Sequence, residues 1–259
     1  TISDKDKLEL GRKKVLMAQK SVYDFARLFF HHLLKEQVPP AHLEVYDILP
    51  KHNFLAIEAF RGFAKTTLGM ILYPMWHSLF KRTGDIALIS MSESFVLNEI
   101  ARKIKSEFES NEILRYHFGD LTTSKWSESY FVLKNGIAFE SCGIGGQLRG
   151  GRRGLIALDD LEDEDSAISE EQRDKLKRRI SKELIPKLVK NGQIIYFGTP
   201  VHNLCYLHQI IQTPNNGWEK RVYPAYKDKI QEEGNEQWSL FDHKRLQGIK
   251  AQLGTTYFS

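Results

Sequence analysis

One stretch of the chain, residues 53–67 (NFLAIEAFRGFAKTT), constrains the fold more strongly than any other. Its first half is an apolar run that predicts a buried strand, and its second half is a turn that brings Lys65 and Thr66 to the start of a helix. Backbone N–H groups at a helix N-terminus attract anions, while a lysine reaches the β- and γ-phosphates and a hydroxyl holds Mg²⁺. The stretch therefore predicts a phosphate-binding loop between a strand and a helix.

The loop departs from the usual pattern, G-x-x-x-x-G-K-[ST], at both of its glycines. Ala59 and Ala64 occupy those two positions, and Gly62 lies between them. An ordinary strand-to-helix turn with a lysine just inside the helix would contain the same residues. The motif alone leaves both interpretations open.

A second stretch, residues 154–162 (GLIALDDLE), places two carboxylates directly after a buried strand. Ligands of open α/β sheets bind at the carboxyl ends of the strands, so both acids would lie near the phosphate loop. In a nucleotide hydrolase Asp159 would hold Mg²⁺ through its water shell, and Asp160 would orient or deprotonate the attacking water. This pairing is a Walker B motif. The alternative is a solvated acidic loop that caps the next helix.

Predicted strands and helices alternate along most of the chain. We expect strands at residues 54–59, 85–90, 154–159, 193–197 and 218–223, and a hairpin with an Asn-Gly turn within residues 130–141. Helices of the intervening lengths form right-handed crossovers between parallel strands. The pattern predicts an α/β fold of the P-loop NTPase (RecA/ASCE-like) class, a mainly parallel sheet flanked by helices. An N-terminal helical region (1–52) would pack on an ATPase core (53–225), followed by a C-terminal segment (226–259).

Length and composition fit one large α/β domain. The chain has 259 residues, of which 41% are hydrophobic, enough for a substantial core. Cys142 and Cys205 stand far apart and outside any C-x-x-C pattern, so we expect no disulfide framework, no zinc site and a reducing compartment. No apolar run approaches the roughly 18 residues of a membrane span, and the first residues lack the apolar core of a signal peptide. We therefore expect a protein of the cell interior.

The net charge of +4 is modest, but cationic residues gather in two predicted helices. One cluster is Arg102, Lys103 and Lys105, and the other is Arg173, Lys175, Lys177, Arg178 and Arg179. Such clusters can contact the phosphate backbone of a nucleic acid without base-specific geometry. The alternative is a solvated helix face, because acids such as Glu107 and Glu170 lie in the same helices.

Two further segments bear on mechanism. Residues 143–153 (GIGGQLRGGRR) form a glycine-rich loop with three arginines, which we expect to be mobile and near the nucleotide. A guanidinium there could stabilise charge on a transferring phosphoryl group, in its own subunit or across a ring interface. Residues 197–200 (FGTP) end a buried strand, where the Thr199 hydroxyl could sense the γ-phosphate. A flexible basic loop and an ordinary turn are the respective alternatives.

Taken in order, segments 59–67, 145–150, 155–160 and 197–200 resemble those of the large terminase subunits of tailed bacteriophages, ATP-driven motors that package DNA into a prohead. Phosphate loops with an arginine ahead of the lysine are usual in that family. The resemblance implies an ATPase that binds ATP and Mg²⁺ and translocates double-stranded DNA. It also implies a homo-oligomeric ring on a portal protein, a small terminase subunit as partner, and work in the cytoplasm of an infected bacterium.

The resemblance assigns roles within the phosphate loop. Arg61 would be the loop arginine, Lys65 the phosphate ligand and Thr66 the Mg²⁺ ligand. The remaining nucleotide contacts would come from Gly62, Phe63, Ala64 and Thr67.

Three more roles are implied outside that loop. Arg149 matches the position of a finger that in some members reaches into the neighbouring subunit's site. Thr199 belongs to the motif that couples hydrolysis to movement, and His42 stands where the family often has an adenine-contacting glutamine.

The chain departs from the family at its catalytic carboxylate and after its core. Many members carry a glutamate where this chain has Asp160, whose side chain is one methylene shorter. Glu162 could activate the attacking water instead, but we favour Asp160 for that role. The residues after Gly198 are too few for the family's nuclease domain, so we expect an isolated ATPase domain or a truncated chain, without DNA cleavage. A superfamily 2 helicase-like or remodelling ATPase, and a non-hydrolytic nucleotide-binding scaffold, remain alternatives.

Overall fold

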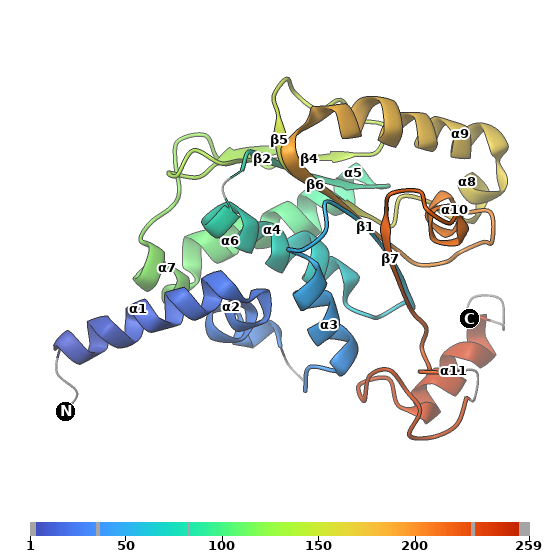
Figure 1. The fold of residues 1–259 in the computed structure, drawn as a ribbon, viewed down its shortest axis with the longest axis horizontal. Helices are drawn as coiled ribbons and strands as arrows, with labels where there is room; N and C mark the ends of the chain where they lie inside the picture. Colours follow the sequence, from blue (N-terminus) through green and yellow to red (C-terminus); the bar gives the residue numbers. More distant parts are fainter. Residues whose placement is uncertain (1–3, 35–36, 82, 229–230, 254–259) are drawn as a thin grey trace.

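The computed structural model describes residues 4–34, 37–81, 83–228 and 231–253. Its centre is a sheet of seven strands: β1 (Phe54–Ala59), β2 (Asp85–Ser90), β3 (Tyr130–Val132), β4 (Ala138–Gly143), β5 (Arg153–Asp159), β6 (Leu188–Gly198) and β7 (Glu219–Tyr223). They lie in the order β3-β4-β2-β5-β6-β1-β7 (Figure 1). All neighbours are parallel except β3 and β4, which are antiparallel. The mainly parallel α/β sheet and its hairpin are confirmed.

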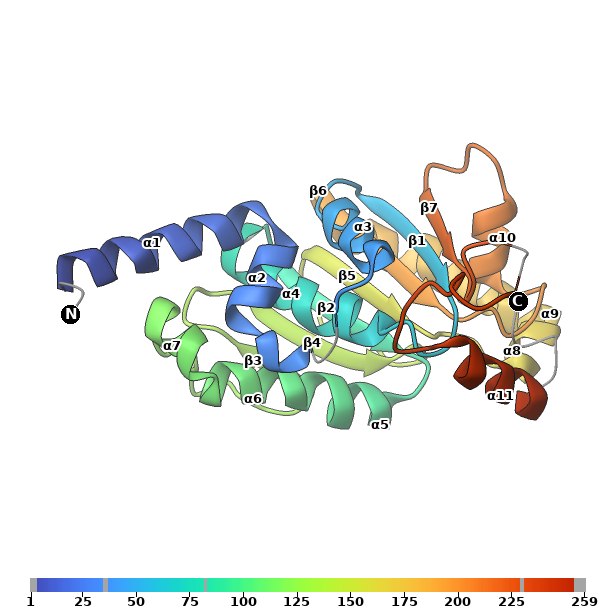
Figure 2. The same ribbon diagram turned by 90° about the horizontal axis from the view of Figure 1, so that it is seen from below.

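Helices cover both faces of this sheet (Figures 1 and 2). The first face carries α1 (Asp4–Lys20), α2 (Val22–Phe29), η1 (His31–Leu33), α3 (Pro40–Ile48), η2 (Thr66–Leu72), α4 (Tyr73–Trp76), η3 (His77–Lys81), α5 (Glu93–Phe95), η4 (Val96–Ala101), α6 (Arg102–Ser110) and α7 (Glu112–Phe118). The opposite face carries α8 (Glu164–Ile168), α9 (Glu170–Arg178), η5 (Arg179–Leu184), η6 (Ile185–Lys187) and α10 (Tyr206–Gln212). The last helix, α11 (His243–Leu253), follows β7.

Side chains alternate between the two faces along each strand, which creates two cores. In β1, Leu55 and Ile57 pack into the first core, whereas Ala56 packs into the second. The helix after β1 lies very close to the sheet: a Cβ added at Gly69 would stand 2.3 Å from the ring of Phe197 in β6. This contact fixes the start of that helix over the ends of the central strands.

Several helices begin where a polar side chain caps them. In the predicted N-terminal helical region, α1 and α2 are separate helices, because the Ser21 side chain accepts a hydrogen bond from the Asp24 N–H and so begins α2. Helix α7 begins in the same way at Asn111, whose side chain accepts from the Leu114 N–H. The acidic stretch after Asp160 does cap the next helix, because Asp163 and Ser166 form a capping box that begins α8.

The segment after β7 packs against the rest of the chain. Tyr226, Phe241 and Leu246 are buried in the same core as the N-terminal helices and the helix after β1. Consequently this core takes side chains from all three of the segments predicted from the sequence. Among the described helices, none has the length and apolar composition needed to cross a membrane.

Candidate nucleotide-binding site

The phosphate-loop candidate is a tight turn between β1 and η2. Gly62 has φ +98° and Ala64 has φ +64°, so both adopt left-handed backbone conformations. Such a conformation is unfavourable for alanine by roughly 1–2 kcal/mol, which explains why glycine is usual at the second of these positions. The first usual glycine position is Ala59, which still belongs to the strand and needs no special conformation.

Gly62 is further constrained by the C-terminal segment. A Cβ added at Gly62 would lie 2.2 Å from the ring of Phe241, which packs directly on the turn. Phe241 also meets Phe60 edge-on, with 5.4 Å between ring centroids. This contact was not predicted from the sequence, where the only hint is that Trp238 and Phe241 are aromatic residues in a largely polar stretch.

Lys65 is buried at the centre of the turn. Its Nζ donates hydrogen bonds to the carbonyl oxygens of Ala59 and Phe60, both at 3.2 Å, and to Thr199 Oγ1 at 2.8 Å. Burial lowers the pKa of this ammonium, and the nearby carboxylates of Asp160 and Asp159 oppose that shift. Arg61 is exposed on the same turn and lies near enough to disfavour the Lys65 charge.

Thr66 and Asp159 meet beside this lysine. Thr66 Oγ1 donates a 2.5 Å hydrogen bond to Asp159 Oδ2. Asp159 is buried at the end of β5, and burial, followed by the adjacent charge of Asp160, raises the pKa of its carboxyl to about 7. Its other oxygen, Oδ1, is buried without a hydrogen-bond partner among the described residues.

These oxygens fit a hard cation such as Mg²⁺, which prefers oxygen ligands and keeps several waters when it binds to nucleotides. The unpartnered Asp159 Oδ1 provides the acceptor that such a hydrated cation needs. Within the part of the chain that the structure describes, no group of three or more His, Cys, Asp or Glu side chains could hold a metal.

Asp160 and Glu162 have different surroundings. Asp160 is exposed, has φ +40°, and accepts a 2.8 Å hydrogen bond from the Thr199 N–H. Glu162 instead accepts hydrogen bonds from the N–H groups of Tyr206 and Leu207 at the start of α10, and from the Tyr196 hydroxyl. The geometry gives Glu162 a role in holding α10 and leaves Asp160 open to the site.

Thr199 connects the two motifs. Its hydroxyl accepts from Lys65, and its N–H donates to Asp160. This arrangement follows from the register of the sheet, in which Asp159 lies opposite Phe197 and Glu58 of β1 opposite Gly198. Three neighbouring strands therefore deliver their motifs to one place.

His42 forms part of the support of the turn. Its Nε2 lies 2.8 Å from the Phe63 carbonyl oxygen, an acceptor, so this nitrogen carries the proton. Burial lowers the pKa of His42 to about 4, and the hydrogen bond to Phe63 partly opposes the shift. The imidazole also packs edge-on against Phe63 and Trp238, each with ring centroids 4.7 Å apart.

A cavity of about 220 Å³ opens beside this histidine. Ala64, Thr67 and Leu68 from the phosphate turn and its helix line one side. The other lining residues come from the N-terminal region and the C-terminal segment and are mostly apolar: Leu33, Leu34, Val38, Pro39, His42, Tyr46, Trp238 and Leu240. The cavity thus adjoins the turn and has apolar walls.

Arg149 does not lie with these residues. Its guanidinium carbon stands 4.3 Å from the ring centroid of Tyr130 in β3, and its Nε lies 4.0 Å from Glu140 Oε1 in β4. Strand β4 is separated from β1 by β2, β5 and β6, so four strand spacings of about 4.8 Å intervene, or about 19 Å. The Arg149 side chain therefore lies away from β1, although Ile144 and Gly145 at the start of the same loop line a cavity together with Leu161 and Glu162, just after the two carboxylates.

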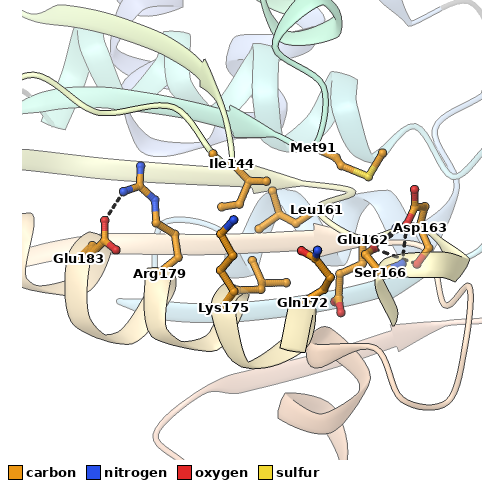
Figure 3. A pocket seen from close by; sticks show the side chains of 12 residues that line it. Met91, Ile144, Leu161, Glu162, Asp163, Ser166, Gln172, Lys175, Arg179 and Glu183 are labelled. Carbon is orange, nitrogen blue, oxygen red and sulfur yellow. Dashed lines mark hydrogen bonds and ion pairs between the residues drawn. The ribbon is translucent and has the colours of Figure 1, made fainter. Parts of the chain in front are cut away.

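In the second basic cluster, some side chains are bound to other parts of the chain and others are exposed to solvent. Arg173 donates to the carbonyls of Ala167 and Ile168, and Arg179 donates to the Gly146 carbonyl and pairs with Glu183. Arg179 and Lys175 line a cavity of about 300 Å³ between α9 and the carboxyl ends of β2, β4 and β5 (Figure 3). Its apolar floor is formed by Met91, Ile144, Leu161 and Leu176. Lys177 and Arg178 remain exposed.

The strand order and the position of the phosphate turn define a P-loop NTPase fold of the ASCE type, as predicted. The second strand of the fold in sequence, β2, is not beside β1, because β5 and β6 lie between them. The Walker B candidate strand, β5, and the strand that ends in Thr199, β6, occupy these two central positions. No protein-family model matches the chain, and no curated protein sequence matches it.

Solved structures of phage large terminases share this fold. The large terminase of bacteriophage HK97 is similar over 84% of this chain and 48% of its own, with 15% identity and a TM-score of 0.58. A mutant of the large terminase ATPase domain of Thermus phage P74-26 is similar over 88% of this chain and 94% of its own, with 13% identity and a TM-score of 0.58. The large terminase of the thermophilic bacteriophage D6E in complex with ATP-γ-S is similar over 85% of this chain and 50% of its own, with 10% identity and a TM-score of 0.51.

The chain therefore has the fold of the ATPase domain of phage large terminases, and the resemblance found in the sequence is confirmed at the level of the fold. It spans about half of the HK97 and D6E proteins, at 48% and 50% of their lengths. It spans 94% of the chain of the Thermus phage ATPase domain.

Proposed function

We propose that this chain is the ATP-hydrolysing motor domain of a viral DNA-packaging terminase. The observation that carries the proposal is the convergence of Lys65, Thr66, Asp159, Asp160 and Thr199 at the carboxyl ends of three adjacent strands. An ordinary turn and an unrelated acidic loop would have no reason to form this hydrogen-bonded set. The fold shared with terminase ATPase domains, one of them solved with ATP-γ-S, supports the same conclusion.

The phosphates of ATP would bind at the N–H groups of the turn and of the start of η2, where the helix dipole favours an anion. Lys65 would exchange its hydrogen bonds to the Ala59 and Phe60 carbonyls for bonds to β- and γ-phosphate oxygens. Arg61, which is exposed on the same turn, would add a second positive charge near the phosphates. Residues 62–64 and 66–67 complete this part of the site.

Thr66 and Asp159 would hold Mg²⁺, Asp159 through bound water, since their oxygens fit such an ion. When bound, the ion supplies neutralisation of charge on the β- and γ-phosphates. Asp160 would orient and deprotonate the attacking water, because it is the exposed carboxylate of the pair. Thr199, which bonds both Lys65 and Asp160, would transmit the state of the γ-phosphate to the loop that leads into α10.

The adenine base would occupy the 220 Å³ cavity beside the turn. Apolar walls with few polar groups are typical of such pockets. The ring of Trp238 and the side chains of Pro39 and Leu240 would contact the base, and His42 would form a wall. His42 Nε2 is engaged with Phe63, so this histidine would shape the pocket and would not donate from that nitrogen to the base.

The partners of such a motor are double-stranded DNA, a portal protein, a small terminase subunit and further copies of the chain in a ring. Exposed Lys177 and Arg178, together with the cluster on α6, supply cations suited to DNA phosphates. A motor of this kind would work in the cytoplasm of the infected bacterium.

The proposal is tested by comparing the rates of ATP hydrolysis of the parent protein and the Lys65→Ala variant. We expect the parent protein to hydrolyse ATP faster with double-stranded DNA present, and Lys65→Ala to lose turnover by about a hundred-fold or more, with weakened binding of a fluorescent ATP analogue. Lys51→Ala is the matched control, because Lys51 is an exposed lysine paired with Asp47 on the surface. Displacement of a triplex-forming strand from duplex DNA then measures translocation.

Each alternative has its own outcome in these assays. Retained turnover in a folded Lys65→Ala protein would contradict the phosphate-loop assignment. Binding of ATP by the parent without hydrolysis would indicate a nucleotide-binding scaffold. Stimulation by single-stranded DNA with strand separation would indicate a helicase-like enzyme.

A further inference from the structure

The backbone of Arg149 is fixed by a buried ion pair. Glu140 in β4 and Arg153 at the start of β5 are almost fully buried and paired with each other, and Arg153 also lies 3.6 Å from Asp85. The Arg149 N–H donates a 2.8 Å hydrogen bond to Glu140 Oε1, and its carbonyl accepts a 3.1 Å hydrogen bond from Arg153. Both backbone polar groups of Arg149 are therefore bound to one buried pair.

The same loop is held at its other end. Arg179 donates to the Gly146 carbonyl. It also pairs with Glu183, as the dashed line in Figure 3 shows. Between these two attachments, Leu148 is buried in the second core. The glycine-rich segment therefore presents Arg149 from an anchored backbone, in place of the mobile loop expected from its composition.

The Arg149 side chain behaves differently from its backbone. It is 60% exposed, and its guanidinium lies over the Tyr130 ring at the edge of the sheet. Among the described residues, the guanidinium donates no hydrogen bond of its own. Stacking occupies only the face of a guanidinium, and Glu140 Oε1 lies 4.0 Å from Nε, so the terminal N–H donors, which lie in the plane, remain available to another group.

We infer that Tyr130 is a positioning residue for Arg149, holding the guanidinium so that its terminal N–H donors can meet the nucleotide bound by a neighbouring copy. The inference rests on the proposed function. An arginine side chain carries about 2 kcal/mol of rotamer entropy, and a stacking partner removes part of that freedom before the neighbour arrives. The ring thus lowers the entropy lost when Arg149 meets phosphate.

The chemistry of the acceptor is complementary to this arrangement. The phosphates of ATP in a neighbouring copy are anions at an open strand edge, and guanidinium binds phosphate oxygens through paired N–H donors. Within its own chain, the Arg149 side chain lies against Tyr130 and Glu140.

Two substitutions at Tyr130 separate stacking from packing. Tyr130→Leu removes the aromatic face but keeps an apolar side chain, and Tyr130→Phe keeps the face. We expect Tyr130→Leu to lower kcat by about two- to five-fold, the size of an exposed cation–π contact, with KM for ATP unchanged. Tyr130→Phe should retain the parent kcat. In an Arg149→Ala background, Tyr130→Leu should have no further effect on kcat.

The measurement is steady-state hydrolysis at protein concentrations where copies associate, with circular dichroism confirming the fold of each variant. A kcat for Tyr130→Phe as low as that of Tyr130→Leu would overturn the role of the ring face. A further loss of kcat when Tyr130→Leu is added to Arg149→Ala would assign Tyr130 a structural role and overturn the inference. Parent-like kcat in Arg149→Ala would overturn the finger itself while leaving ATP hydrolysis intact, and a parent without hydrolysis would contradict the proposed function.

Discussion

The nucleotide edge and the finger edge of the sheet are built in opposite ways. At the nucleotide edge, formed by the carboxyl ends of β1, β5 and β6, buried or partly buried polar groups are bonded to one another. At the finger edge, formed by β3, β4 and the loop before β5, one exposed arginine stands on a buried ion pair. The first edge holds the candidate phosphate loop, the candidate metal ligands and the exposed Asp160, whereas the second presents a largely exposed guanidinium that stacks on Tyr130. Under the proposed function, the two edges would complete each other between neighbouring copies of the chain, and experiments at each edge can test this.

The largest effect is expected from removing the finger. Arginine fingers contribute about a thousand-fold or more to phosphoryl transfer, so Arg149→Ala should bind ATP like the parent but lose most of its hydrolysis. Mixing it with Lys65→Ala should restore part of the activity, because a subunit with an intact phosphate turn then meets a neighbour with an intact arginine. The measurement is steady-state turnover as a function of mixing ratio.

The dilution dependence provides the control for that mixture. If the two edges belong to different copies, activity per subunit of the parent should fall as the protein is diluted below its association range. Full activity in a monomer, lost on Arg149→Ala, would mean that the finger works within its own chain and would break the comparison.

A second prediction sharpens the chemistry of the nucleotide edge. Asp160→Asn should lower hydrolysis by about a hundred-fold or more while ATP affinity stays near that of the parent, because only water activation is lost. Glu162→Gln should mainly lower thermal stability, since Glu162 accepts hydrogen bonds at the start of α10 and burial raises the pKa of its carboxyl. The opposite pattern, with Asp160→Asn active and Glu162→Gln inactive, would transfer the catalytic role to Glu162.

The two edges also differ in what the sequence could reveal. The strand bounds of β1 and the positions of Lys65 and Asp159 were predictable, because each motif is a short run whose strand and turn signals are local. The place of Arg149 was not predictable, because it depends on the pairing of Glu140 with Arg153, residues on different strands. A glycine-rich composition suggested mobility, but long-range contacts hold that loop.

The C-terminal segment adds a similar lesson at the nucleotide edge. Trp238 and Phe241 reach the phosphate turn from the C-terminal segment after β7, which the sequence did not place beside this turn. Neither residue has a periodic pattern that would place it there. Their position depends on how the chain returns after β7, which local sequence signals do not encode.

The smallest expected effect is a change in stability with pH caused by His42, whose neutral imidazole is hydrogen-bonded to the turn at Phe63. Burial lowers the pKa of His42 to about 4 from an ordinary value of 6.5, so between these values the unfolded chain binds a proton that the folded chain does not. The free energy of unfolding should therefore fall as the pH is lowered through this range. Between pH 6.5 and 5 the difference contributed by His42 is about 2 kcal/mol.

His42→Gln isolates this contribution, since glutamine can donate to the Phe63 carbonyl and does not titrate. Urea unfolding of both proteins at several pH values measures the difference, and the slopes from all other groups, Asp159 included, cancel when the two curves are subtracted. The parent should lose stability relative to His42→Gln on acidification. If the free energies of unfolding of the two proteins change in parallel with pH, protonated His42 is tolerated beside Phe63 and Trp238. The surroundings of His42 would then be as open to solvent as those of Arg149. If the stability difference between the two proteins grows toward pH 5, the turn is supported by a neutral imidazole packed between aromatic rings and away from water. Such a buried support would contrast with the exposed guanidinium of Arg149 at the other edge.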